Sequence, residues 1–124
     1  MIQRCAHIAG ILALGFAASP AFAEYSSVAV NSKTGNYGYS HSWKTSSKAD
    51  ARAMHYCRQY SKGAEGCKVV FRTNKCAAIV YAGGALYTIK ESRTRGGAEA
   101  AAMQACQAAY GNKCTLKQNY CAAQ

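Results

Sequence analysis

The stretch ADARAMHYC (49–57) returns 49 residues later as AEAAAMQAC (98–106), with five of the nine positions identical. The same offset lays residues 27–57 over residues 76–106 without a gap, and removing two residues then brings Cys67 onto Cys114. Two copies are too few for a solenoid. The pattern instead predicts one domain built by duplicating a supersecondary unit, with pseudo-repeats at about 25–75 and 76–124.

Each copy is predicted to begin with two strands joined by a turn. In the first copy, runs 28–30 and 37–39 flank a polar turn that contains Gly35. In the second copy, the run 76–81 is apolar at nearly every position, as expected for a strand covered on both faces. It is followed by Gly83-Gly84 and a second strand, so both copies predict a hairpin.

A helix is predicted to follow each hairpin. Alanine or cysteine recurs every four residues along one face of 49–57 and of 98–106, which indicates a buried helical face. Ser47, with Asp50 three residues later, resembles a capping box that would begin the first helix. Asp50 and its counterpart Glu99 are expected in the first helical turn, where a carboxylate favours the helix dipole.

A last strand is predicted to close each copy. Val69 and Phe71 alternate in the predicted strand 68–72 of the first copy, and the predicted strand 115–120 of the second copy contains Leu116 and Tyr120. The predicted fold class is therefore α+β: two strand-strand-helix-strand pseudo-repeats forming one small disulfide-stapled domain, with Ala-rich helices lying on a sheet.

The N-terminal residues predict export. Arg4 supplies a positive charge, residues 8–18 are apolar, Pro20 ends that run, and Ala21-Phe22-Ala23 fits a signal-peptidase site. The apolar run is about half of the ~20 residues that a membrane-spanning helix needs. We expect residues 1–23 to be a cleaved signal peptide and residues 24–124 to be a single secreted or periplasmic domain. An N-terminal anchor left uncleaved is the alternative.

Cysteine usage agrees with export, because an even number in a small exported domain indicates a disulfide framework. The six cysteines outside the expected signal peptide are Cys57, Cys67, Cys76, Cys106, Cys114 and Cys121. The repeat places Cys57–Cys67 and Cys106–Cys114 alike, which leaves Cys76 to pair with Cys121. A helix-to-helix bridge between Cys57 and Cys106 is the rival that the repeat also allows.

The expected mature chain is strongly basic. Without Arg4, 14 Lys and Arg residues face five Asp and Glu residues, a net charge of +9 spread over both copies. Such a charge steers a protein toward an anionic surface or an acidic protein, including peripheral contact with a membrane. Solubility alone is the alternative. Export argues against nucleic acid as the natural partner, and a monomer is expected.

Candidate binding residues combine cations with nearby aromatic side chains. Lys44, Lys48 and Arg52 are predicted to line one helix face, with Lys68 and Arg72 on a neighbouring strand and Tyr39 and Trp43 close in sequence. The alternative for Tyr39 and for Tyr37 is a place in the core.

No catalytic site, metal site or cofactor is predicted. His41 and His55 are interpreted as solvated or packed side chains. No C-x2-C or H-x3-H spacing is present that would indicate a zinc site. The glycine pairs lack the lysine of a phosphate loop. The sequence therefore predicts a non-enzymatic binding or effector protein. A periplasmic or secreted inhibitor or immunity protein against a toxin or a cell-wall hydrolase, presenting loop 31–36 or 82–85, is the second hypothesis.

A family resemblance adds to these predictions. The hairpin Tyr37-Gly38-Tyr39-Ser40, the helix ending in Cys57, the run Cys67-Lys68-Val69-Val70 and the strand opening Cys76-Ala77-Ala78 resemble the bacterial secreted family known as domain of unknown function 4189. The resemblance covers Tyr25 to Cys121. It implies an exported single domain, with effectors among the members, and it supplies no catalytic residues.

Overall fold

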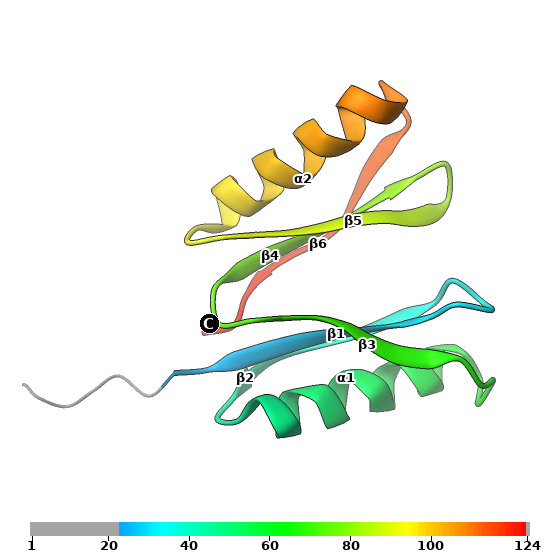
Figure 1. The fold of residues 1–124 in the computed structure, drawn as a ribbon, viewed down its shortest axis with the longest axis vertical. Coiled ribbons are helices and arrows are strands. Elements are labelled where there is room, and N and C mark those ends of the chain that lie inside the picture. The colour runs from blue at the N-terminus through cyan, green and yellow to red at the C-terminus, as the bar shows by residue number, and fades with distance from the viewer. Residues whose placement is uncertain (1–22, 124) are drawn as a thin grey trace, which may run out of the picture.

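The computed structural model describes residues 23–123 as two three-stranded antiparallel sheets, each with one helix (Figure 1). The elements are β1 (Tyr25–Asn31), β2 (Tyr37–Trp43), α1 (Ser46–Tyr60), β3 (Cys67–Thr73), β4 (Cys76–Ala82), β5 (Ala85–Ser92), α2 (Arg95–Tyr110) and β6 (Cys114–Cys121). The predicted α+β class and the repeated strand-strand-helix-strand order are confirmed. The predicted signal peptide, residues 1–23, lies outside the described residues apart from Ala23.

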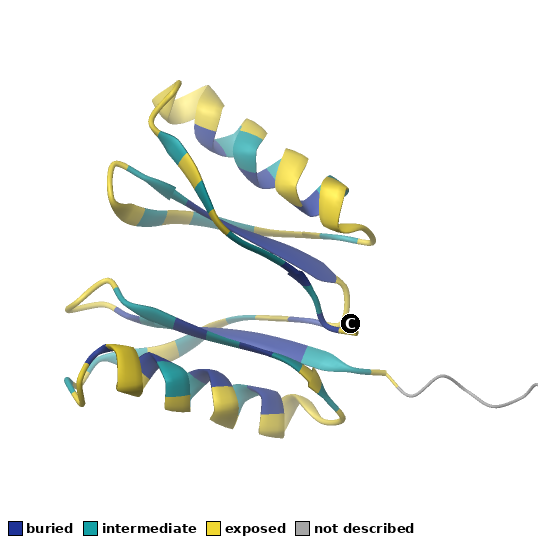
Figure 2. Ribbon diagram, turned by 180° about the vertical axis from the view of Figure 1, so that it is seen from behind, coloured by how far each residue is buried: buried dark blue, intermediate teal, exposed yellow. Residues whose placement is uncertain are grey.

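The two copies form separate sheets that pack face to face, whereas the sequence analysis placed the helices on one sheet. The strand orders are β2-β1-β3 and β5-β4-β6, so β1 and β4 are the central strands. The layers run helix, sheet, sheet, helix (Figure 2). Val28, Ala77, Ile79 and Tyr120 form the buried cluster between the sheets. Each central strand is therefore covered on both faces, as the apolar run 76–81 predicts.

Small side chains bring each helix close to its own sheet. The fully buried residues of α1 are Ala49, Ala53 and Cys57, and those of α2 are Ala98, Ala102 and Cys106. These are the two faces that the four-residue spacing predicts. Beneath α1, Gly38 leaves no room for a side chain, because an added Cβ would lie 2.3 Å from the backbone nitrogen of Cys57. The helix thus rests directly on the backbone of β2.

All four edge strands carry a β-bulge opposite a central strand. The extra residues are Val70 in β3, Tyr87 in β5, Lys117 in β6, and one residue at His41-Ser42 in β2, where Ser42 has φ 66°. Bulges twist an edge and interrupt its pairing, which protects it from adding a further strand.

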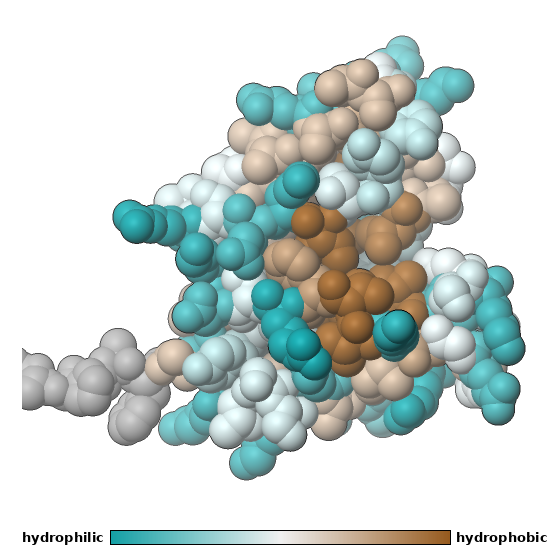
Figure 3. Space-filling model, viewed as in Figure 1, coloured by the Kyte–Doolittle hydropathy of each residue, from teal (hydrophilic) through white to brown (hydrophobic). Residues whose placement is uncertain are grey.

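The bulges overturn the predicted faces of the last strands. Val69 packs under α1 while Phe71 lies between the sheets, because the bulged Val70 separates them. In the same way Leu116 packs under α2 and Tyr120 lies between the sheets. Val70 itself is 52% exposed, and hydrophobic side chains reach the surface between the sheets on the side of β3 and β5 (Figure 3).

Three disulfides join Cys57 to Cys67, Cys106 to Cys114, and Cys76 to Cys121. These are the pairs that the repeat predicts, and the first two tie each helix to the strand that follows it. The rival bridge between Cys57 and Cys106 is absent, because the two helices lie on opposite outer layers with both sheets between them (Figure 2).

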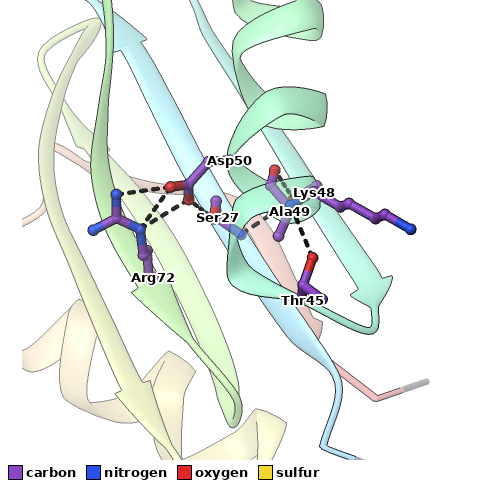
Figure 4. A network of polar contacts seen from close by, with 7 residues as sticks. Ser27, Thr45, Lys48, Ala49, Asp50 and Arg72 are labelled. Carbon is purple, nitrogen blue, oxygen red and sulfur yellow. Dashed lines mark hydrogen bonds and ion pairs between the residues drawn. The ribbon is translucent and has the colours of Figure 1, made fainter.

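The predicted capping box is wrong. Thr45 caps α1 by accepting a hydrogen bond from the backbone N–H of Lys48, and Thr94 caps α2 by accepting one from Gly97. Neither first turn contains an acidic residue. Asp50 instead joins α1 to the sheet: it accepts hydrogen bonds from Ser27 and Arg72 (Figure 4), and the guanidinium of Arg72 lies 2.7 Å from its carboxylate.

This bridge predicts a pH dependence of stability. The hydrogen bonds from Arg72, aided by that from Ser27, outweigh desolvation and hold the pKa of Asp50 below its usual value. A depressed folded-state pKa adds stability above the unfolded pKa, near 3.9, and that stability is lost as pH falls through the folded pKa. Urea unfolding between pH 2.5 and 7 should show that the free energy of unfolding falls less steeply with decreasing pH for Asp50→Asn than for the wild-type chain. Glu65→Gln, the same change at an exposed residue, should keep the wild-type slope; equal slopes for all three proteins would contradict the prediction.

A groove between β2 and α1

A hollow on the surface lies between the outer edge of β2 and the side of α1. Its volume is about 400 Å³. The lining residues are Tyr39, Ser40, His41, Trp43, Arg52, Tyr56 and Tyr60. Five of these seven side chains are aromatic or imidazole rings, so the walls combine flat apolar faces with polar edges.

A second hollow of about 250 Å³ adjoins the first. It is lined by Trp43, Lys48, Ala51, Arg52 and His55. Trp43 and Arg52 line both hollows, so the two hollows adjoin at these side chains, and together they are called here the β2–α1 groove. Its two parts together have the size of an ordinary small-ligand site.

Helix periodicity explains the α1 wall of the groove. Lys48, Arg52, Tyr56 and Tyr60 follow one another at intervals of four residues, so they lie one above the other along a single stripe of the helix. This stripe runs beside the buried Ala49–Ala53–Cys57 face. The helix can therefore bury its alanines on the sheet while the long side chains flank β2.

Contacts with aromatic rings hold the side chains of this stripe in place. The guanidinium carbon of Arg52 lies 5.0 Å from the centre of the Tyr56 ring, which is a cation–π contact. Tyr56 and Tyr60 lie nearly parallel with ring centres 6.3 Å apart, and His55 meets Tyr56 edge to face at 5.4 Å. Across the groove, the ring centres of Tyr39 and Tyr120 lie 4.6 Å apart between the sheets, so the ring of Tyr39 is anchored in the core. The walls are thus held by packing on both sides.

The groove is cationic. Within residues 23–123 the salt bridges are Arg72–Asp50 and Lys75–Glu91, so neither Lys48 nor Arg52 is ion-paired. Among the described residues no carboxylate lines either hollow, and the nearest acid in sequence, Asp50, is neutralised by Arg72. An anion entering the groove would meet two exposed positive charges and no competing negative charge.

The structure brings four of the predicted binding residues together: Tyr39, Trp43, Lys48 and Arg52 all line the groove. Lys44 follows Trp43 but lines neither hollow. Lys68 and Arg72 do not line the groove, because they lie on β3, which is separated from β2 by β1. Arg72 is moreover bound to Asp50.

The sequence did not predict six of the lining residues, namely Ser40, His41, Ala51, His55, Tyr56 and Tyr60. The signal for the two tyrosines was present, since they continue the four-residue spacing of Lys48 and Arg52. The histidines carried a similar signal, since His55 lies three residues after Arg52 on the helix and His41 lies two residues after Tyr39 on the strand.

Two chemical features bear on what the groove can hold. The described residues 23–123 contain no cluster of three His, Cys, Asp or Glu side chains that could bind a metal ion. Over the same residues, no helix has both the length and the apolar character needed to span a membrane. The arrangement of rings and cations is suited to holding an anionic ligand.

Comparisons with known proteins give one result about the family. The model of a family described as domain of unknown function (DUF4189) matches residues 25–121. The match begins at the first residue of β1 and ends at the last residue of β6, so it spans both copies of the repeat. No curated protein and no solved structure matches the chain.

Proposed function

This chain belongs to the DUF4189 family, and we propose that it is an exported binding or effector protein, without enzymatic activity, whose β2–α1 groove takes an anionic partner. The family description assigns no function, so the proposal depends on the surface of the molecule. The observation that carries it is the pairing of Lys48 and Arg52, two cations without ion-pair partners, with the ring-lined hollows on either side of Arg52.

Export is supported by the cysteines. Three disulfides join all six cysteines of the described chain, which suggests an oxidising compartment outside the cytosol. Arg4, which precedes an apolar stretch, and the Ala21-Phe22-Ala23 site support a signal peptide. A secreted or periplasmic monomer that meets anionic surfaces or acidic proteins, and not nucleic acid as its natural partner, fits both features.

The test is a charge reversal in the groove, Lys48→Glu with Arg52→Glu. Binding to heparin and to anionic vesicles should weaken about tenfold or more at low salt, chiefly through slower association. Wild-type binding should also weaken as salt rises, because exposed charges act over about 8 Å at physiological ionic strength. The fold should survive, since Lys48 lies in the first helical turn, where an acidic residue is favoured.

The matched control is Lys90→Glu with Lys113→Glu, which changes the net charge equally on exposed residues of the second copy. This variant should lose much less affinity than the groove variant. Equal losses would mean that only total charge matters, and no loss in either would mean that the charge serves solubility. In both cases the inhibitor hypothesis, with loops 31–36 and 82–85 as the contact surfaces, would replace the groove.

A further inference from the structure

We propose that the ligand of the β2–α1 groove is an acidic polysaccharide, bound through at least two successive sugar rings. This inference rests on the proposed function and narrows it from any anion to a chain of ring-shaped units that carry negative charge. Four observations support it: the replacement of the large groove residues in the second copy, the two adjoining hollows, the spacing of the cations, and the open edge of β2.

The second copy of the repeat serves as an internal control for what the fold requires. The buried residues of α1 have identical counterparts in α2, since Ala49, Ala53 and Cys57 match Ala98, Ala102 and Cys106. The large side chains of the groove do not. Trp43 corresponds to Ser92, Lys48 to Gly97, Arg52 to Ala101, His55 to Gln104, Tyr56 to Ala105 and Tyr60 to Ala109. A helix packs on its sheet equally well without these large side chains, so packing does not account for them in the first copy.

The shape of the groove favours a chain of rings. Its two hollows share Trp43 and Arg52, so a ligand that fills both must pass this junction. A pyranose ring has a face of C–H groups that packs on an aromatic ring, with its hydroxyls at the rim. Trp43 and Tyr60 offer such ring faces along the path, whereas the guanidinium of Arg52 lies over the ring of Tyr56 and is held beside the path by that contact.

The spacing of the two cations suits a ligand that carries one negative charge on each sugar ring. Lys48 and Arg52 lie one helical turn apart, about 6 Å along the axis of α1. Arg52 stands at the junction and Lys48 in the smaller hollow, so each hollow has a cation at its wall. A guanidinium binds a carboxylate or a sulfate through two parallel hydrogen bonds, which suits the acidic group of a sugar.

The edge of β2 supplies hydrogen-bonding groups for hydroxyls. β2 pairs only with β1, so its other side presents backbone N–H and C=O groups, apart from Ser42 N–H, which donates to Ala122. A polyhydroxylated ligand can use both donors and acceptors there. A polyanion without hydroxyl groups would not use these backbone groups, which would stay hydrogen-bonded to water.

A membrane surface fits the groove less well. The rings of Tyr39, Trp43 and Tyr56 are partly buried walls of a hollow, and among the lining tyrosines only Tyr60, 58% exposed, protrudes strongly. Nucleic acid would use the same stacking, but it is scarce in the oxidising compartment that the disulfides indicate. Both ligands are therefore outcomes of the test.

The test compares defined ligands by calorimetric titration of the oxidised protein. The probes are a tetramer of galacturonic acid, the uncharged galactose tetramer, end-blocked tetraglutamate, a thymidylate tetramer and phosphatidylglycerol vesicles. The galacturonate tetramer should bind about tenfold or more tightly than the galactose tetramer, which lacks its charge, and than tetraglutamate, which lacks its rings.

Variants that carry the residue of the second copy separate stacking from charge. Trp43→Ser should weaken galacturonate binding about tenfold while leaving tetraglutamate binding unchanged, whereas Arg52→Ala should weaken both. Tyr60→Ala, a change at a largely exposed residue, repeats the stacking test if Trp43→Ser fails to fold. Lys90→Ala, which removes the same charge elsewhere, should have little effect.

The inference is overturned if tetraglutamate binds as tightly as galacturonate, or if Trp43→Ser and Tyr60→Ala leave galacturonate binding intact. It is also overturned if thymidylate or vesicles bind more tightly than galacturonate. In each of these cases Arg52→Ala would still weaken the anion that does bind, and the proposed function would stand. If no anion responds to Arg52→Ala, both proposals fail.

Discussion

Replacing Gly38 with alanine is expected to destabilise the protein by about 3 kcal/mol, at the upper end of the range for overpacked cores. An added Cβ would lie 2.3 Å from the backbone nitrogen of Cys57 and 2.5 Å from the backbone oxygen of Ala53. Both atoms belong to the backbone of α1, so no side-chain rotation can relieve the contact. The whole helix would have to move away from the sheet, and the buried alanines would lose their packing.

Thermal unfolding followed by circular dichroism measures this effect. For a domain of this size a loss of about 3 kcal/mol should lower Tm by more than about 10 °C. Gly96→Ala is the matched control: it adds the same methyl group in the first turn of α2, where a Cβ would meet no atom within 4 Å. That variant should be neutral or slightly stabilised, since alanine favours a helix more than glycine does. Similar Tm values for the two variants would contradict the close approach of α1 to β2.

The largest effect is expected from removing the disulfide Cys76–Cys121, for which Cys76→Ala with Cys121→Ala is the variant. The two cysteines are 45 residues apart in sequence, and closing a loop of that length stabilises a protein by about 4 kcal/mol through the entropy of the unfolded chain. The bridge also joins the central strand β4 to the edge strand β6 within the second sheet. Its loss frees the C-terminal strand of the domain in the unfolded state.

Removing Cys106–Cys114 in the same way provides the comparison. Its cysteines are eight residues apart, so the same entropy model gives about 2.5 kcal/mol. Urea unfolding of both variants under oxidising conditions should therefore show the larger loss for Cys76–Cys121. A larger loss for Cys106–Cys114 would mean that helix anchoring outweighs loop length in this fold.

The sequence and the structure agree most closely where contacts are local. The four-residue spacing of Ala49, Ala53 and Cys57 reports which side of a helix is apolar, and a helix must bury that side on something. The two glycine-containing turns mark hairpins, because each joins strands that pair with each other directly. The disulfides Cys57–Cys67 and Cys106–Cys114 follow from the same local geometry, since each links the end of a helix to the strand after it.

The candidate site was only half predicted. Lys48 and Arg52 were found from helix periodicity, and Tyr39 and Trp43 from their closeness in sequence to those cations. That Lys68 and Arg72 lie away from the groove was not foreseen, because the sequence does not say on which side of β1 each of its neighbours lies. Asp50 was given a local role at the helix end, although its real partners, Ser27 and Arg72, lie 23 and 22 residues away.

By itself, then, the sequence determined the duplication, the order of strands and helices and the buried face of each helix, all of which follow from spacing along the chain. It also proposed the three cysteine pairs, and the structure excluded the rival bridge between Cys57 and Cys106. Tertiary structure alone decided that the two copies form separate sheets packed face to face. It also decided where the bulges lie and that the edge of β2 meets α1 to form a groove.

The physical reason is that a repeat constrains contacts within each copy, whereas the packing of one copy on the other depends on how Val28, Ile79 and Tyr120 fill the space between the sheets. A bulge shifts every later side chain to the opposite face, so one extra residue such as Val70 changes which side chains a strand presents to the core. The residue types along the strand do not show where such a bulge lies.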